Sequence, residues 1–333
     1  MKILFNRNNS IGIFCLLLLL AVGAVSCIKD EYAESKEKAT LTLYFTTTKN
    51  SNGTSSDGTI IGPELPNEHM RTLRVIVADE EGNIRYNTKV DVPQDQTQTV
   101  INFSELIVDS EGETKFDVYA IANEEVYVRN NEWEGTNINL NELKELKDKI
   151  LDNTILSKLN AGISANEYKE GCAVPQTAIQ EVTVTLGQEN SATIPLEFVV
   201  AKMELNFENT SLMTQTLTNV ALTDMDVSET TLFPVENIET VVNDFFWSSI
   251  EIPSEKKYSI VKYLYEGQTD NNYLLTTSWG NNSLNLTEKG LGTEISRGNK
   301  LVINVTLNSQ QEASLDFLVI PWSEHNIDVP AFQ

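Results

Sequence analysis

The residue most clearly suited to a chemical reaction is a cysteine at the border between an apolar and a charged segment. In AVGAVSCIKDEY, residues 21–32, Cys27 follows the small residues Ala24 and Ser26. A thiol is the group that can carry a diacylglycerol, whereas ordinary leader cleavage needs small residues but no thiol. We therefore expect Cys27 to be the lipidated first residue of the mature chain. The alternative is a cysteine that merely follows a cleavage site.

The residues before Cys27 have the layout of a secretory leader. Lys2 and Arg7 give a positive start, no acidic residue precedes the cysteine, and the apolar run 11–25 is too short to span a bilayer. The junction resembles a bacterial lipobox, which predicts a lipoprotein signal peptide over residues 1–26. Acyl chains such as palmitate would then anchor the protein, because each buried methylene contributes about 0.8 kcal/mol.

A short charged tether is expected over residues 27–38. Its residues Lys29, Asp30 and Glu31 resemble the signal with which Bacteroidota send lipoproteins to the outer face of the outer membrane. The expected location is therefore the outer membrane, with the protein exposed at the cell surface.

The composition excludes some classes of partner. The chain has 24 basic and 48 acidic residues, and loss of Lys2 and Arg7 with the leader takes the net charge from −24 to −26. Phosphate contact needs clustered Lys and Arg, so we expect no nucleic-acid partner. Cys172 is the one cysteine left once Cys15 leaves with the leader and Cys27 is lipidated. No intrachain disulfide is then possible, and the fold must be stabilised by its buried cores.

Few other residues have the types and spacing that catalysis or metal binding needs. The two histidines, His69 and His325, are too few for a usual zinc site, and no GxSxG, HExxH, GxGxxG or P-loop motif occurs. Cys172 is more simply a buried thiol than a nucleophile, and the acidic turn at 79–83 lacks EF-hand spacing. We therefore expect no enzyme activity, no cofactor and no metal.

Period-two alternation dominates the remainder of the chain. In ATLTLYF, residues 39–45, it places Leu41, Leu43 and Phe45 on one face. A chain with many half-buried strands and no βαβ rhythm is most simply all-β, a pair of antiparallel β-sandwiches. Strands are predicted at 39–45, 73–77, 84–91, 98–103, 114–123, 181–187, 198–208, 216–225, 258–265, 272–278, 300–307 and 312–320.

One short helix is predicted in the N-terminal domain, where it would cover an edge of the sandwich. The segment NLNELKELKDKILDNTIL can be capped by Asn139 and Glu142. Its apolar stripe consists of Leu140, Leu143, Leu146, Ile150 and Leu151. The expected domains are an N-terminal sandwich over 39–196 and a C-terminal sandwich over 197–333. A polar loop over 46–59 follows the first strand.

Several segments, in this order, resemble the fimbrillin superfamily of Bacteroidota, which contains the major and minor fimbrial subunits and their anchor proteins. The resemblance spans nearly the whole chain after the cysteine. It rests on ATLTLYF, TLRVIVADEEGNI, FDVYAIANEE, VPQTAIQEVTVTL, IPLEFVVAKMELNFEN and the final strands with Pro321 and Trp322.

The resemblance implies two transthyretin-like antiparallel β-sandwich domains in a protein exported as a lipoprotein and assembled into a fimbrium. In polymerising members a protease removes the first strand after a basic residue, and a strand of a neighbouring subunit fills the groove. In this chain the exchanged strand would be the one carrying Leu41, Leu43 and Phe45. The basic residues available for processing are Lys49 and Arg71.

The C-terminal segment is the candidate donor strand. Ile327, Val329 and Ala331 alternate there with polar residues and proline, although an ordinary last strand of the second sandwich would look the same. The expected partners are other fimbrial subunits, bound by strand exchange, and a host or bacterial surface receptor.

The role within a fimbrium stays open. No Arg lies between Cys27 and Arg71, which departs from the cleaved pattern of the family. A chain that is not cut would keep its lipid and first strand and serve as an anchor in cell adhesion. A cut chain would serve as a stalk subunit, and a tip adhesin would also need a ligand-binding face.

A glycan-binding outer-membrane surface lipoprotein is the competing hypothesis. It would share the export signal, the tether and the β-sandwiches. Aromatic residues such as Phe245, Phe246, Trp247 and Trp279 could stack on sugars, although packing in the core is favoured. A stable monomer that binds oligosaccharide would support this class.

Overall fold

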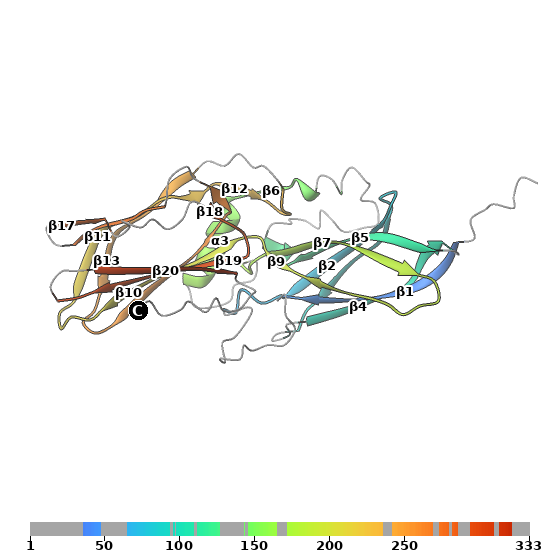
Figure 1. Cartoon of the computed structure of the whole chain (residues 1–333), viewed down its shortest axis with the longest axis horizontal. Helices are drawn as coiled ribbons and strands as arrows, with labels where there is room; N and C mark the ends of the chain where they lie inside the picture. The colour runs from blue at the N-terminus through green and yellow to red at the C-terminus, as the bar shows by residue number, and fades with distance from the viewer. Residues whose placement is uncertain are drawn as a thin grey trace, which may run out of the picture.

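The computed structural model describes residues 36–47, 65–93, 96, 98–109, 112–126, 143, 146–164, 172–235, 242–268, 273–279, 282–285, 294–309 and 313–321. These residues form mainly β-strands, and two groups of sheets lie end to end in an elongated body (Figure 1). The predicted all-β sandwich class is confirmed. No helix among the described residues is long and apolar enough to cross a bilayer.

The N-terminal half contains two sheets that share one apolar core. The first has the order β4-β1-β8, with bounds β4 (Gln98–Asp109), β1 (Lys36–Thr46) and β8 (Asn190–Pro195). The second has the order β3-β2-β5-β7-β9, with bounds β3 (Ile84–Asp91), β2 (Thr72–Asp79), β5 (Glu113–Ala122), β7 (Gln176–Thr185) and β9 (Glu197–Phe198). The inward faces of both sheets are apolar, as alternation in a sandwich requires.

The C-terminal half repeats this arrangement. One sheet has the order β14-β10-β19-β20, with bounds β14 (Lys257–Leu264), β10 (Ala201–Asn209), β19 (Asn299–Leu307) and β20 (Ala313–Pro321). The other has the order β13-β11-β16-β17, with bounds β13 (Val242–Ile252), β11 (Gln215–Val227), β16 (Leu275–Trp279) and β17 (Asn282–Asn285). The last strand of the N-terminal sheets ends at Phe198, and the first strand of the C-terminal sheets begins at Ala201.

A third core fills the junction between the halves. Its buried residues come from both, including Ile76 and Tyr119 of the first half and Phe233 and Tyr263 of the second. The smaller elements gather around it: η1 (Glu124–Val126), β6 (Ile150–Asp152), α3 (Asn153–Ser164), β12 (Glu229–Thr231), β15 (Gly267–Gln268) and β18 (Glu294–Ile295). β6 of the first half pairs with β12 of the second, which ties the halves together.

The segment predicted as one helix, residues 139–156, is interrupted by a strand. Ile150–Asp152 form β6 because they pair with Glu229–Thr231, a partner far along the chain. Helical residues occur before β6, and the well-defined helix α3 begins only at Asn153, where the Asp152 carboxylate accepts a hydrogen bond from the Thr154 N–H at 3.0 Å. α3 packs into the junction core, and its Asn160 Oδ1 accepts a hydrogen bond at 3.2 Å from the Tyr263 N–H of the edge strand β14, so the helix covers an edge of a C-terminal sheet.

The sheets also contain two parallel pairs, β1 with β8 and β10 with β19, beside the expected antiparallel ones. In addition, β4 continues past a β-bulge, beyond the end of the predicted strand. The alternation of Ile101 and Phe103 breaks at Glu105, whose φ is +74°, and resumes inward at Leu106 and Val108. A bulge inserts one extra residue and so reverses the inward parity, which is why the predicted strand stopped at residue 103.

Tyr273 gives the C-terminal core a pH dependence. Its hydroxyl donates to the Gly267 carbonyl at 3.0 Å, and burial, with the charges of Glu294 and Asp224, raises its pKa from 10.0 to about 12. Between these values the unfolded chain loses a proton that the folded chain keeps, so stability falls as pH rises. We expect the melting temperature to fall above pH 10, and to fall less in Tyr273→Phe. If Tyr273→Phe and the exposed-site control Tyr258→Phe gave the same profile, this expectation would be wrong.

Candidate functional site

The first strand lies inside its sheet and not at an edge. β1 pairs antiparallel with β4 along its whole length and parallel with β8 over Leu41–Thr46. Removal of β1 would therefore leave β4 and β8 with unpaired backbone groups that face each other across a gap. We call the space that β1 occupies between these two strands the β1 groove.

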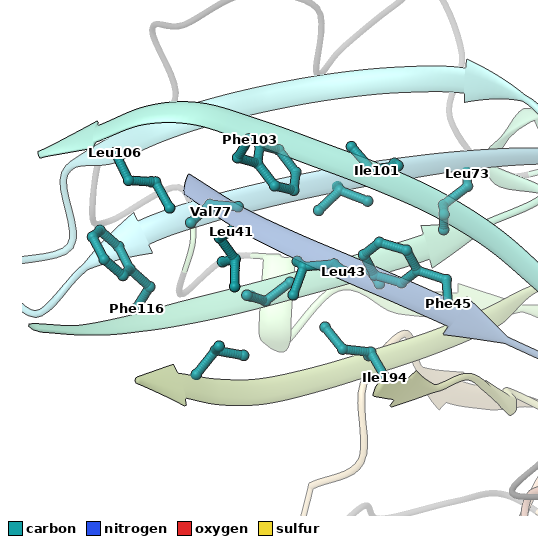
Figure 2. Close-up of a cluster of buried hydrophobic side chains, with 14 of the residues drawn as sticks. Leu41, Leu43, Phe45, Leu73, Val77, Ile101, Phe103, Leu106, Phe116 and Ile194 are labelled. Carbon is teal, nitrogen blue, oxygen red and sulfur yellow. The ribbon is translucent and has the colours of Figure 1, made fainter. Parts of the chain in front are cut away.

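Alternate side chains of β1 fill the floor of the β1 groove. Leu41, Leu43 and Phe45 have no exposed surface, and Ala39 is 7% exposed. Figure 2 shows the three larger side chains within an apolar cluster that also contains Leu73, Val77, Ile101, Phe103, Leu106, Phe116 and Ile194. The expected common face of Leu41, Leu43 and Phe45 is therefore present, while their exchange stays a prediction.

The burial of these side chains is large on the scale of domain stability. A fully buried Leu or Phe contributes about 1.5–3 kcal/mol, so Leu41, Leu43 and Phe45 together contribute roughly 5–9 kcal/mol. The net stability of a whole domain is typically only about 5–15 kcal/mol. The N-terminal half consequently needs a strand in the β1 groove, either its own or a substitute.

The bulge in β4 limits which strands fit. The pairing of β1 with β4 shifts by one residue between Ala39 and Thr40, opposite Glu105. Glu105 forms an exposed ion pair with Lys38 at 3.0 Å. A replacement strand that runs in the same direction must therefore pair with β4 across the same one-residue shift if its alternate side chains are to point inward as those of β1 do.

Arg71, one of the two predicted processing positions, is held at the start of β2. Its N–H donates to Asn123 Oδ1 at 2.8 Å, and its carbonyl accepts from the Val92 N–H at 2.7 Å. Its Nη2 donates to the Pro66 carbonyl at 2.7 Å. Cleavage after Arg71 would require local opening of these bonds. Lys49 lies outside the described residues, and cleavage at either position stays a prediction.

The remaining predicted assembly residues also lie outside the described residues. They are Cys27 with its signal peptide and the candidate donor residues Ile327, Val329 and Ala331. The described chain begins at Lys36 and ends at Pro321, the last residue of the edge strand β20. Lipidation and strand donation are therefore still predictions.

The acidic turn after β2 uses its carboxylate within the hairpin. Asp79 pairs with Arg85 and accepts a hydrogen bond from the Asn83 N–H at 2.7 Å. Burial raises the pKa of Asp79, but the hydrogen bonds from Asn83 and the Arg85 charge outweigh it and lower this pKa. Within the described ranges, no three His, Cys, Asp or Glu side chains group so that they could hold a metal ion. Cys172 is buried, at 9% exposure.

The aromatic residues of the glycan hypothesis are mostly packed into the protein. Phe245 and Trp247 stack with ring centroids 6.2 Å apart and contact the C-terminal core, while Phe246 is 60% exposed. Trp279 is 3% exposed, and its Nε1 donates to Gln215 Oε1 at 2.9 Å. A buried indole offers no ring face to a sugar, so Trp279 is not available for stacking.

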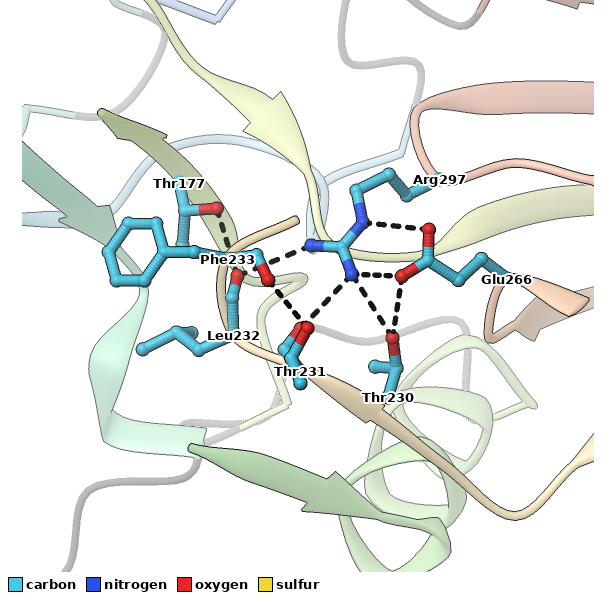
Figure 3. Close-up of polar contacts among 7 residues, drawn as sticks. All are labelled: Thr177, Thr230, Thr231, Leu232, Phe233, Glu266 and Arg297. Carbon is cyan, nitrogen blue, oxygen red and sulfur yellow. Dashed lines mark hydrogen bonds and ion pairs between the residues drawn. The ribbon is translucent and has the colours of Figure 1, made fainter. Parts of the chain in front are cut away.

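A polar network at the junction holds the linker after β12. Figure 3 shows Arg297, whose guanidinium pairs with Glu266 and donates to Thr230 Oγ1 at 3.1 Å. From the first half, the Thr177 hydroxyl donates to the Leu232 carbonyl at 3.1 Å. Side chains of both halves therefore fix the same linker.

A cavity of about 420 Å³ lies beside this network. It is lined by Lys147, Thr177, Ala178, Ile179, Gln180, Pro195, Glu197, Pro234 and Arg297. Arg297 is the buried cation of this lining, and it is already paired with Glu266. An anionic ligand would have to displace that carboxylate, so the cavity gives no strong case for a ligand site.

The pattern of the sequence did not reveal the strand on the other side of the β1 groove. In β8, Ala192 lies opposite Leu43 and Ile194 lies opposite Phe45. The available signal was short: a turn at Gly187, where φ is +73°, followed by these two alternating apolar residues. A strand with one large buried residue is too weakly patterned to be predicted by periodicity.

Comparisons with known proteins identify this architecture. No protein-family model and no curated protein matches the sequence. The structure is similar to the tip fimbrial protein Mfa3 from Porphyromonas gingivalis, solved with a C-terminal truncation, at a TM-score of 0.56 and 12% identity over 86% of this chain and 100% of that one. A protein described provisionally as a cell adhesion protein, from Bacteroides eggerthii, gives 0.50 at 13% identity over 86% and 96%.

Identities this low establish the fold and leave the activity open. The sequence resemblance is confirmed at that level, because both solved structures are matched over almost their whole length. The chain therefore has the fold of these two solved proteins.

Proposed function

We propose that this protein is a structural subunit of a surface fimbrium that serves cell adhesion. The observation that carries the proposal is the position of β1, the first strand of the described chain, in the middle of a sheet with Leu41, Leu43 and Phe45 fully buried. The likeness of the fold to a tip fimbrial protein supports the same role. The proposed division is into an N-terminal domain ending near residue 196 and a C-terminal domain after it.

Assembly would proceed by exchange of one strand for another. Proteolysis in the segment after β1 would release that strand and open the β1 groove, which exposes apolar pockets and two unpaired strand edges. A strand of a neighbouring subunit would then restore the backbone hydrogen bonds and refill the pockets. The C-terminal segment, with Ile327, Val329 and Ala331, is the proposed donor for the next subunit.

The proposed location is the outer face of the outer membrane. The protein would be exported there as a lipoprotein and anchored by acyl chains on Cys27. If β1 is kept, the lipid is kept as well and the subunit anchors the fimbrium. If β1 is released, the subunit leaves the membrane and serves in the stalk or at the tip, where a surface receptor would be its further partner.

Mass spectrometry of the protein recovered from the cell surface tests the proposal. In a stalk or tip subunit we expect a mature N-terminus between residues 50 and 72, in material that copurifies with filaments. In an anchor we expect acylated Cys27 in material attached to filaments. An acylated monomer that is absent from filaments, and that binds oligosaccharide, would reject the proposal in favour of a glycan-binding lipoprotein.

A further inference from the structure

The residues that precede β2 are held by contacts to both halves of the protein. We call Leu65–Arg71 the junction segment. The Asn67 carbonyl accepts from the Val174 N–H at 2.7 Å, and the Glu68 carbonyl accepts from Gln176 Nε2 at 2.9 Å. Further contacts hold the His69 carbonyl and, as described above, both backbone groups of Arg71. The junction segment is thus bonded to the N-terminal half along its length.

Glu68 bonds the junction segment to the C-terminal half as well. Its Oε1 lies 3.0 Å from Lys202 Nζ, and the two side chains are 0% and 1% exposed. The Tyr263 hydroxyl donates to the same oxygen at 3.1 Å, and Asn67 Nδ2 donates to that hydroxyl at 3.1 Å. Lys202 is the second residue of β10 and Tyr263 lies on β14, so the Glu68 carboxylate links the segment to the first sheet of the second half.

Loss of Glu68 would have a cost that loss of β1 does not have. Lys202 would stay buried without that carboxylate, with Glu204 at 3.2 Å as a remaining partner that is shared with Lys300 at 3.1 Å. Breaking one side of a buried ion pair is strongly destabilising, because the other charge is left in a site from which water is excluded. Cleavage after Arg71 would remove Glu68 together with β1, whereas cleavage before Leu65 would remove β1 alone.

We propose that the junction segment stays bound when β1 is released, so that productive cleavage occurs before Leu65, and that Glu68 is the positioning residue that protects the Arg71–Thr72 bond. This inference rests on the proposed function for its biological meaning. It also means that release of β1 does not disrupt the junction: the β1 groove opens while the contacts between the halves remain intact.

Limited digestion of the whole chain with trypsin tests the inference, with the fragment that begins at Thr72 followed by mass spectrometry. We expect the Arg71–Thr72 bond to be cut at least about a hundredfold more slowly in the native chain than in urea. Glu68→Gln is expected to speed native cleavage there at least about tenfold. The matched control is Glu181→Gln, which weakens an exposed pair with Lys115 and should change the rate less than about twofold.

A second variant covers the case in which Glu68→Gln does not fold. Tyr263→Phe keeps the ion pair and removes the hydroxyl that bonds Glu68, so a smaller acceleration, of about threefold, is expected. Rapid cleavage after Arg71 in the native chain would overturn the inference. Rates in both variants equal to that of Glu181→Gln would overturn it as well.

The inference and the proposed function fail in different ways. Filaments whose subunits begin at Thr72 would reject the inference and keep strand exchange. A protected Arg71–Thr72 bond in a protein that never joins a filament would keep the inference about the junction segment and reject the proposed function.

Discussion

A chain that begins at residue 47 is expected to bind a synthetic peptide of residues 36–46 and to lose the folded N-terminal half without it. The truncated chain lacks the burial of Leu41, Leu43 and Phe45, which we estimate at roughly 5–9 kcal/mol. It also lacks the backbone partner of both β4 and β8. Thermal unfolding of the truncated chain, with and without the peptide, measures the loss of stability. We expect the peptide to raise the melting temperature of the N-terminal half towards that of the full chain.

Two control peptides distinguish binding in the β1 groove from nonspecific peptide binding. Substituting Ser at all three inward positions, Leu41, Leu43 and Phe45, should abolish rescue. Substituting Ser at Thr40 and Thr42, which lie on the outward face, should leave rescue nearly unchanged. If the truncated chain is as stable as the full chain and ignores every peptide, the β1 groove is not an assembly site.

Replacing Lys202 with Met is expected to lower the free energy of unfolding by about 3–5 kcal/mol. The substitution keeps the apolar stem but removes the cation 3.0 Å from the fully buried Glu68 carboxylate. The control is Lys257→Met, which removes a cation 3.3 Å from Glu208 at a site where both side chains are largely exposed, and which should cost only about 0–1 kcal/mol. Urea unfolding of the three proteins gives the comparison.

The double variant tests whether the penalty comes from an uncompensated charge. Glu68→Met combined with Lys202→Met removes both charges from the junction, so most of the lost stability should return, as is found for buried pairs replaced by apolar residues. If the double variant were as unstable as the sum of the single variants, the loss would come from packing or from the other contacts of these side chains.

These two results address different parts of the proposed assembly. The peptide experiment measures how strongly the N-terminal half demands a strand in the β1 groove. The Lys202 experiment measures how strongly the junction resists change while that strand is replaced. An effective subunit needs both properties, because the groove must open without separating the two halves.

Periodicity found most strands but not the irregular ones. It placed Leu41, Leu43 and Phe45 on one face of the first strand, and the structure has them there with no exposed surface. It failed at Glu105 in β4, where φ is positive and the parity of inward residues changes. Inward parity reverses at a bulge, so a strict period of two ends the predicted strand there.

The sequence by itself determined the all-β class, the approximate strand positions and the inward face of the first strand. These properties follow from alternation along a single strand, which is a local consequence of backbone geometry. Only the tertiary structure decided that β1 lies between β4 and β8, that Ile150–Asp152 form a strand, and that Glu68 meets Lys202 at the junction. Each of these depends on a partner distant in the chain, and local pattern contains no information on which distant groups will satisfy a buried charge or an open strand edge.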